Sequence, residues 1–226
     1  MKEPCCAHNF STALCQLFLA ESVTLHVENR CLNRSAASSY TQATEMEEKK
    51  YNDMQTVKRR FFAMRNGVIA DTLRSAGLPY KVIFGLNLPQ IVEIAAETPH
   101  KRELAEALWA NNTTRESMLM APMLIDPSSF SMEDARRWLD TVPTAEVADI
   151  LCHRLLRKTS YAWELAEMLI DSQSAPFDKY VALRLAFNLV ATAPSRALAI
   201  AEKGGSHPVA LALADEARFL ITGELS

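Results

Sequence analysis

The stretch that decides the fold of this 226-residue chain begins at residues 84–97, FGLNLPQIVEIAAE. It continues through 104–117, LAEALWANNTTRES, and 136–156, RRWLDTVPTAEVADILCHRLL. Apolar residues recur three or four positions apart in each segment, which is the spacing of one face of an α-helix. In the first segment, for example, Ile91, Ile94 and Ala95 share such a stripe. The sequence therefore predicts a series of short amphipathic helices.

The same pattern extends on both sides of this stretch. Only 6 glycines occur, and Ala, Leu, Glu and Arg, which favour helices, are among the most frequent residues. A capping box of Thr113 and Glu116 is predicted to open one helix. We expect an all-α protein with one or two helices over residues 46–73 and a helix after Thr113 that includes residues 118–123. Further helices are expected near residues 88–97, 101–110, 131–139, 147–156, 160–170, 177–191, 196–201 and 209–220. Helix pairs repeating at roughly 35 to 45 residues are typical of HEAT-like solenoids, although periodicity alone leaves a helical bundle open.

The N-terminal part of the chain does not share this pattern. Four of the five cysteines lie in the first 31 residues, at spacings that fit neither a zinc knuckle nor a disulfide framework. Residues 33–44 are rich in Ser, Ala and Thr without an apolar stripe. We expect residues 1–44 to be a poorly ordered extension and residues 45–222 to form a single HEAT-like domain.

The charge balance limits the partners of the chain. The net charge is −3, and the residues after Asp53 carry 19 Lys or Arg against 20 Asp or Glu. Proteins that bind duplex DNA usually carry a basic excess, because neutralisation of phosphates supplies much of the affinity. A local basic face on a near-neutral protein stays open. No apolar run of 18 residues occurs, so no membrane span is predicted.

Taken together, the three quoted segments resemble the DNA alkylation repair family, the AlkD-like DNA glycosylases built from HEAT-like repeats. The resemblance covers about residues 61–190. It implies a HEAT-like α-α superhelix that binds duplex DNA on its concave face. It also implies hydrolysis of the N-glycosidic bond of N3- or N7-alkylated purines, with no cofactor and no metal.

The family's characteristic phrase is a tryptophan-aspartate pair followed three residues later by a second aspartate. In this chain AEVAD places Asp149 on the second aspartate, while Ala145 takes the aromatic position and Glu146 the first acidic one. A carboxylate there can stabilise the positive charge that develops on the deoxyribose. The resemblance thus implies that Asp149 is catalytic. An aspartate paired with Arg154 or Arg137 on a solvated helix face is the alternative.

The resemblance also implies residues that contact the DNA. Phe187 matches a second aromatic wall, and Val190 stands where the family has an arginine, for which Arg184 is a substitute. Trp138 is either a further substrate contact or a core residue. The phosphate contacts expected from the basic positions are Arg154, Arg157, Lys158 and Arg115, the last of which could instead pair with a carboxylate.

Two functions follow from these residues. The first is a cytoplasmic, monomeric alkylpurine DNA glycosylase. The second is a non-catalytic HEAT-like module that binds DNA structures or a protein partner, which the near-neutral charge, Ala145 and Val190 favour. No P-loop, dinucleotide fingerprint or metal-protease motif is present. His153 has no partner at metal-ligand spacing, so no metal is expected.

Overall fold

The computed structural model describes residues 51–172 and 174–223. A boundary between two units of the chain falls after Thr44, and the described residues belong to the second unit. The predicted N-terminal extension, residues 1–44, lies outside the described part and stays a prediction.

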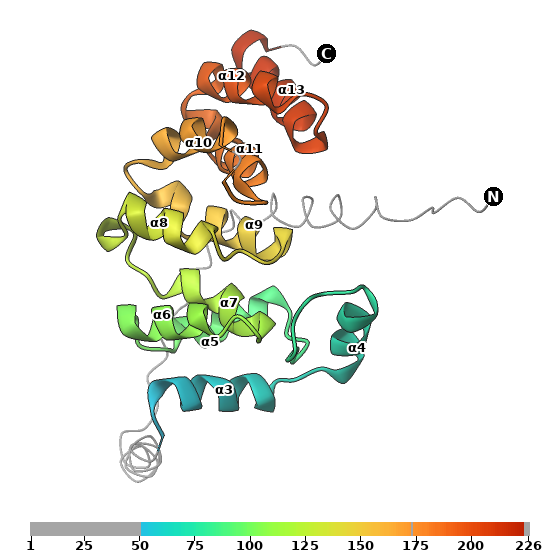
Figure 1. The fold of residues 1–226 in the computed structure, drawn as a ribbon, viewed down its shortest axis with the longest axis vertical. Coiled ribbons are helices and arrows are strands. Elements are labelled where there is room, and N and C mark those ends of the chain that lie inside the picture. The colour runs from blue at the N-terminus through green and yellow to red at the C-terminus, as the bar shows by residue number, and fades with distance from the viewer. Residues whose placement is uncertain (1–50, 173, 224–226) are drawn as a thin grey trace, which may run out of the picture. The chain divides into compact units, whose positions relative to one another are not determined.

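The described residues form an all-α fold with short connections (Figure 1). The only extended pairing among them is an isolated bridge between Val82 and Thr114. The α-helices are α3 (Asp53–Ala63), α4 (Gly67–Ser75), α5 (Leu88–Ala96), α6 (Arg102–Ala110), α7 (Arg115–Met120), α8 (Met132–Leu139), α9 (Ala145–Arg154), α10 (Ala162–Ile170), α11 (Asp178–Leu189), α12 (Pro194–Gly204) and α13 (Pro208–Thr222). Short 3₁₀ turns are η1 (Ala121–Met123), η2 (Pro127–Ser129), η3 (Leu156–Lys158) and η4 (Val190–Thr192).

The helices form two layers, as expected for HEAT-like repeats. In one layer α5, α7, α9, α11 and α13 contact one another in sequence, and we call this the inner layer. In the other layer α3 contacts α6, and α10 contacts α12. The helix α4 and the loop after it are inserted within the first pair, between α3 and α5. The predicted all-α HEAT-like fold is confirmed.

The repeat is shorter than the predicted 35 to 45 residues. The helices α6, α8, α10 and α12 begin at residues 102, 132, 162 and 194. Side chains of adjacent repeats also meet 29 to 35 residues apart, as in Trp163 with Thr192 and Asp149 with Arg184. Most of the helices have 8 to 12 residues and their connections are short, so a helix pair takes about 30 residues.

The helix starts predicted from capping residues are partly confirmed. Ser131 caps α8 through a capping box with Asp134, and α9 begins at Ala145 because the Thr144 hydroxyl accepts from the Val147 amide. This start is two residues earlier than predicted. The predicted capping box of Thr113 and Glu116 is wrong, because α7 has no side-chain cap.

The Glu116 carboxylate instead fastens the inserted loop to α7. The side chain is fully buried, and it accepts the backbone N–H groups of Phe84 and Gly85 at 3.1 and 3.0 Å. Gly85 has φ +77°, and a Cβ there would lie 2.2 Å from the Asn66 carbonyl oxygen. Only glycine fits this approach, so the loop is held close to the N-terminus of α4.

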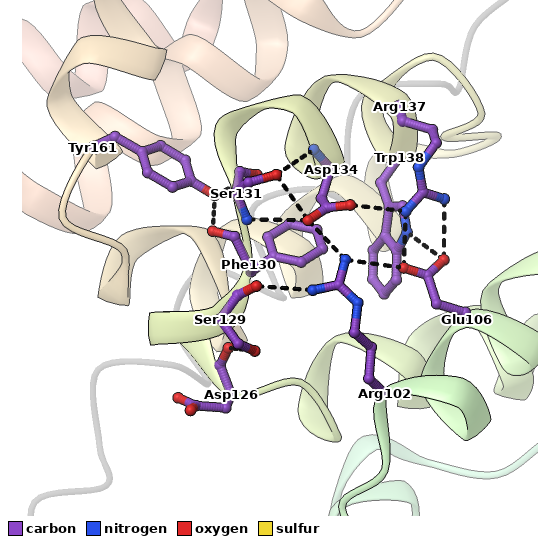
Figure 2. Close-up of polar contacts among 10 residues, drawn as sticks. All are labelled: Arg102, Glu106, Asp126, Ser129, Phe130, Ser131, Asp134, Arg137, Trp138 and Tyr161. Atoms are coloured by element: carbon purple, nitrogen blue, oxygen red, sulfur yellow. Dashed lines mark hydrogen bonds and ion pairs between the residues drawn. The ribbon is translucent and has the colours of Figure 1, made fainter.

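Polar side chains connect α6 and α8, two helices that do not belong to the inner layer (Figure 2). The Glu106 carboxylate accepts from Arg137 at 2.8 and 3.0 Å and from the Trp138 indole at 3.1 Å. Arg102 pairs with Asp134 at 2.7 Å and donates to the Ser129 carbonyl. These bonds hold the adjacent repeats of α6 and α8 together through their side chains.

The α6–α8 contact makes stability sensitive to acid. Partial burial works to raise the pKa of Asp134, but hydrogen bonds from Arg102 and Ser131 hold this pKa well below its usual range. The Arg137 hydrogen bond likewise lowers the pKa of Glu106. A carboxyl with a lowered folded-state pKa stabilises the fold above its unfolded pKa of about 3.9 to 4.3, and this contribution is lost as the pH falls further.

We therefore expect Asp134→Asn to lower the free energy of unfolding at pH 7. The difference from wild type should shrink as the pH falls from about 5 towards 3, because the wild-type carboxyl is then protonated more readily in the unfolded chain. Urea unfolding at several pH values measures this. The exposed Asp71, which pairs only within α4, provides the control Asp71→Asn. A difference that stayed constant with pH would contradict the assignment.

Candidate functional site

A row of polar side chains crosses the inner layer at α9 and α11. Glu146, Asp149 and His153 follow one another at helical spacing along α9. Tyr180 and Arg184 lie one turn apart on α11 and meet Asp149 from the next repeat. The row is a consequence of the fold, because equivalent turns of adjacent inner helices face one another.

Asp149 is held by two donors. The Tyr180 hydroxyl donates to Oδ1 at 2.9 Å, and Arg184 Nε donates to the same oxygen at 2.6 Å. About 21% of the Asp149 side chain is exposed. Because both bonds share one oxygen, the carboxylate has a defined orientation while part of it stays accessible. Asp149 pairs with Arg184 in this arrangement, and Arg137 pairs with Glu106 and Asp134.

The surroundings of Asp149 act on its protonation in opposite directions. Burial raises the pKa of its carboxyl above the usual value, while the Arg184 charge and the Tyr180 hydrogen bond counteract the rise. Burial and the nearby Asp149 charge raise the pKa of Tyr180, so its hydroxyl keeps its proton and remains a donor. The site therefore contains an oriented carboxylate that is easier to protonate than an ordinary aspartate.

A basic cluster follows Asp149 at the C-terminal end of α9. Burial, together with the charges of Arg157 and Arg154, lowers the pKa of His153 to about 4, so this imidazole is neutral at pH 7. Burial and the same two arginines lower the pKa of Lys158. Within the described part of the chain, Arg157 and Lys158 form no ion pair with a carboxylate. Arg157 and Lys158 thus lie close to each other and to Arg154, which favours the binding of an anion.

The structure brings several predicted site residues together. Asp149 contacts Arg184, whose guanidinium carbon lies 6.0 Å from the centre of the half-buried Phe187 ring. The basic cluster begins with Arg154 on the same helix as Asp149 and continues with Arg157 and Lys158 on η3. Tyr180 was missed by the sequence reasoning. It lies one turn before Arg184, and the sequence contains no other signal for it, because its contact with Asp149 depends on the packing of α9 against α11.

Two predicted contact residues are buried elsewhere. Trp138 is fully buried and stacks on Trp109, with ring centres 4.2 Å apart, so the core alternative describes it and the substrate contact does not. Arg115 is 6% exposed and pairs with Glu146 and Glu116, so its guanidinium is not available to a phosphate. The sequence could not separate these alternatives because both depend on packing between repeats.

The two positions at which this chain departs from the family's residues, Ala145 and Val190, differ in exposure. Ala145 is exposed at the start of α9, so the aromatic position of the phrase is at the surface and empty of a ring. Val190 is buried at the end of α11. Over the described ranges, no helix is long and apolar enough to cross a membrane. In the same ranges no group of three or more His, Cys, Asp or Glu is arranged to hold a metal ion.

Comparison with known proteins identifies the family of this chain and a solved structure of similar fold. Residues 40–203 match the family model described as DNA alkylation repair enzyme, so the chain belongs to that family. A solved structure described as "a new family of proteins related to the HEAT-like repeat DNA glycosylases with affinity for branched DNA structures" is similar in fold. Its TM-score is 0.61 at 20% identity, over 75% of this chain and 76% of the other. No curated protein matches the chain at a significant level.

Proposed function

We propose that this protein is a cytoplasmic DNA repair glycosylase that releases cationic N3- or N7-alkylated purines from duplex DNA. The observation that carries the proposal is Asp149, an oriented and partly exposed carboxylate beside a basic cluster. The family membership supports DNA as the substrate.

The chemistry needs little more than this carboxylate. As the bond from C1′ to the purine nitrogen breaks, positive charge develops on the deoxyribose and the bonding electrons stay with the base, which was already cationic. Asp149 can stabilise the sugar cation and orient the water that adds to C1′. The leaving purine is neutral after cleavage, so it requires no general acid.

Binding is assigned to the cations around Asp149. Arg154, Arg157 and Lys158 follow it on α9 and η3 and would hold phosphates on one side of the lesion. Phe187 and Arg184 would border the sugar from α11. This local cluster answers the objection from the near-neutral chain, because phosphate contacts depend on the charge at the interface.

Ala145 favours a second candidate function, the binding of branched or distorted DNA without base excision. The exposed aromatic position of the family phrase is an alanine, which removes one wall of a lesion site. A protein with the same fold is described as having affinity for branched DNA structures. In this alternative the pairing of Asp149 with Arg184 would serve only to join α9 and α11.

Base release separates the two functions. The purified full-length protein is incubated with duplex DNA containing N7-methylguanine, and free base is measured against the spontaneous background. We expect release above background, with none from the same duplex carrying unmodified guanine. Background release by a folded protein that binds a DNA junction would reject the glycosylase and support the second function.

A further inference from the structure

The helix α3, which lies far from Asp149 in the sequence, carries a second surface suited to DNA. Lys58 and Arg59 lie four and three residues before Phe62, so each of them neighbours Phe62 on one side of α3. All three are exposed, and 56% of Phe62 is accessible. The Arg65 guanidinium lies over the Phe62 ring, 3.9 Å from its centre. We call these four residues the α3 patch.

The α3 patch lies in the most basic part of the chain. Between Asp53 and Glu93 the sequence has six Lys or Arg and a single acidic residue, Asp71, although the whole chain has a net charge of −3. Arg60 pairs with Glu97, and Arg74 pairs with Asp71. Lys58, Arg59 and Arg65 pair with no carboxylate of the described residues, so their charge is available to an anion.

The aromatic component distinguishes this patch from a simple basic face. Phe62 exposes a large apolar ring, and Arg59 lies over the neighbouring Tyr51 ring at 4.2 Å. Cations that alternate with exposed rings are the pattern with which proteins hold single strands, the rings stacking on bases and the cations meeting phosphates. The bases of an intact duplex are stacked on one another and cannot reach such a ring.

The patch is held rigidly on its helix. Val57 and Phe61 on the opposite side of α3 are buried in the core. Ion pairs of Arg60 with Glu97 and of Lys101 with Asp53 fix the helix to the following elements. The exposed ring is therefore presented without a rearrangement, which lowers the cost of binding.

We propose that the α3 patch binds a single-stranded segment of the DNA ligand, such as an unpaired tail or the unpaired bases at a branch. The inference rests on the proposed function in so far as DNA is the ligand, but it does not require base excision. It assigns duplex contact to the basic cluster at the end of α9 and single-strand contact to α3.

The test compares two fluorescent DNAs that share one paired sequence, a blunt duplex and the same duplex with a single-stranded thymidine tail. We expect the wild-type full chain to bind the tailed duplex roughly tenfold more tightly. Phe62→Ala should remove this preference and leave the affinity for the blunt duplex unchanged. Phe62→Trp should keep it, because the ring is retained.

Matched variants complete the design. Phe219, an exposed aromatic on α13, supplies the control Phe219→Ala, which should keep the tail preference. Arg59→Ala should reduce the salt dependence of binding for the tailed DNA alone, by about 0.7 in the logarithmic slope for one lost phosphate contact. The double variant Arg157→Ala, Lys158→Ala should lower the affinity for both DNAs by the same factor.

The outcomes distinguish the two proposals. If wild type bound the two DNAs equally, or if the tail preference survived Phe62→Ala, the role proposed for the α3 patch would be rejected. The proposed function would be unaffected. A tail preference lost in Phe62→Ala together with no base release would support the patch and reject the glycosylase. Wild-type protein that bound neither DNA would reject both.

Discussion

Replacing Asp149 with asparagine is expected to reduce release of N7-methylguanine at least a hundredfold while DNA affinity stays nearly unchanged. Asparagine can still accept from Tyr180 and Arg184 through its side-chain oxygen, so the contact between α9 and α11 is retained. What is lost is the negative charge that would stabilise the sugar cation. Removal of one such electrostatic group typically costs about 10² to 10³ in rate.

The same residue predicts a pH dependence. Base release requires the ionised carboxylate, and burial raises the pKa of Asp149 above the value of about 3.9 for an ordinary aspartate. Activity should therefore fall on acidification at a higher pH than that value predicts, before the fold is lost. Single-turnover rates measured across the acid range, with circular dichroism at each pH, separate the two effects.

Asp215→Asn is the matched control for this experiment. Asp215 is an exposed aspartate on α13 that pairs with Arg218 on the same helix. We expect wild-type base release from this variant. An equal loss of base release and DNA affinity in Asp149→Asn would mean that Asp149 acts by maintaining the binding face, and its catalytic role would be rejected.

Trp138→Ala is expected to have the largest effect on stability, lowering the free energy of unfolding by about 3 to 5 kcal/mol. The side chain is fully buried, its ring stacks on Trp109, and its edge contact with Phe130 spans 5.1 Å between ring centres. Its indole N–H also donates to Glu106 (Figure 2). Truncation removes these contacts and leaves a cavity between the repeats of α6 and α8.

Urea unfolding followed by far-UV circular dichroism measures this effect. The control is Trp163→Ala, because Trp163 is half-buried, donates to Thr192 at 3.2 Å and lies against Arg196. We expect a loss of about 1 kcal/mol for that variant. Similar losses for the two variants would show that the stacked pair of tryptophans does not dominate the core between these repeats.

Most of the fold could be predicted from local signals. The apolar stripe of Ile91, Ile94 and Ala95 predicted α5 almost to the residue, and all three are buried. Ser131 predicted the start of α8 for the same reason, since helix periodicity and N-caps depend on residues within one or two turns. Glu116 was assigned to a local cap because its true partners, the amides of Phe84 and Gly85, are more than thirty residues away.

The candidate site was predictable only in part. Asp149 was identified through the family phrase, Arg184 as a substitute for the arginine missing at Val190, and the cations after Asp149 from their basic positions. The fold brings Asp149 and Arg184 into contact. Trp138 and Arg115 have the residue types expected of a DNA contact, yet both are buried. Whether a tryptophan or arginine on an amphipathic helix faces the core, another repeat or solvent depends on how the neighbouring repeat packs against it.

The sequence by itself determined the all-α class, the succession of short helices and the position of Asp149, because these depend on nearby residues or on a family phrase. The tertiary structure alone decided that Tyr180 and Arg184 orient Asp149, that Arg115 is sequestered by carboxylates, and that Phe62 is left exposed among cations. The first two depend on side chains about thirty residues apart, and the third depends on how the described helices leave one side of α3 uncovered. Local periodicity contains neither kind of information, because the energy that selects a partner arises only when repeats pack together.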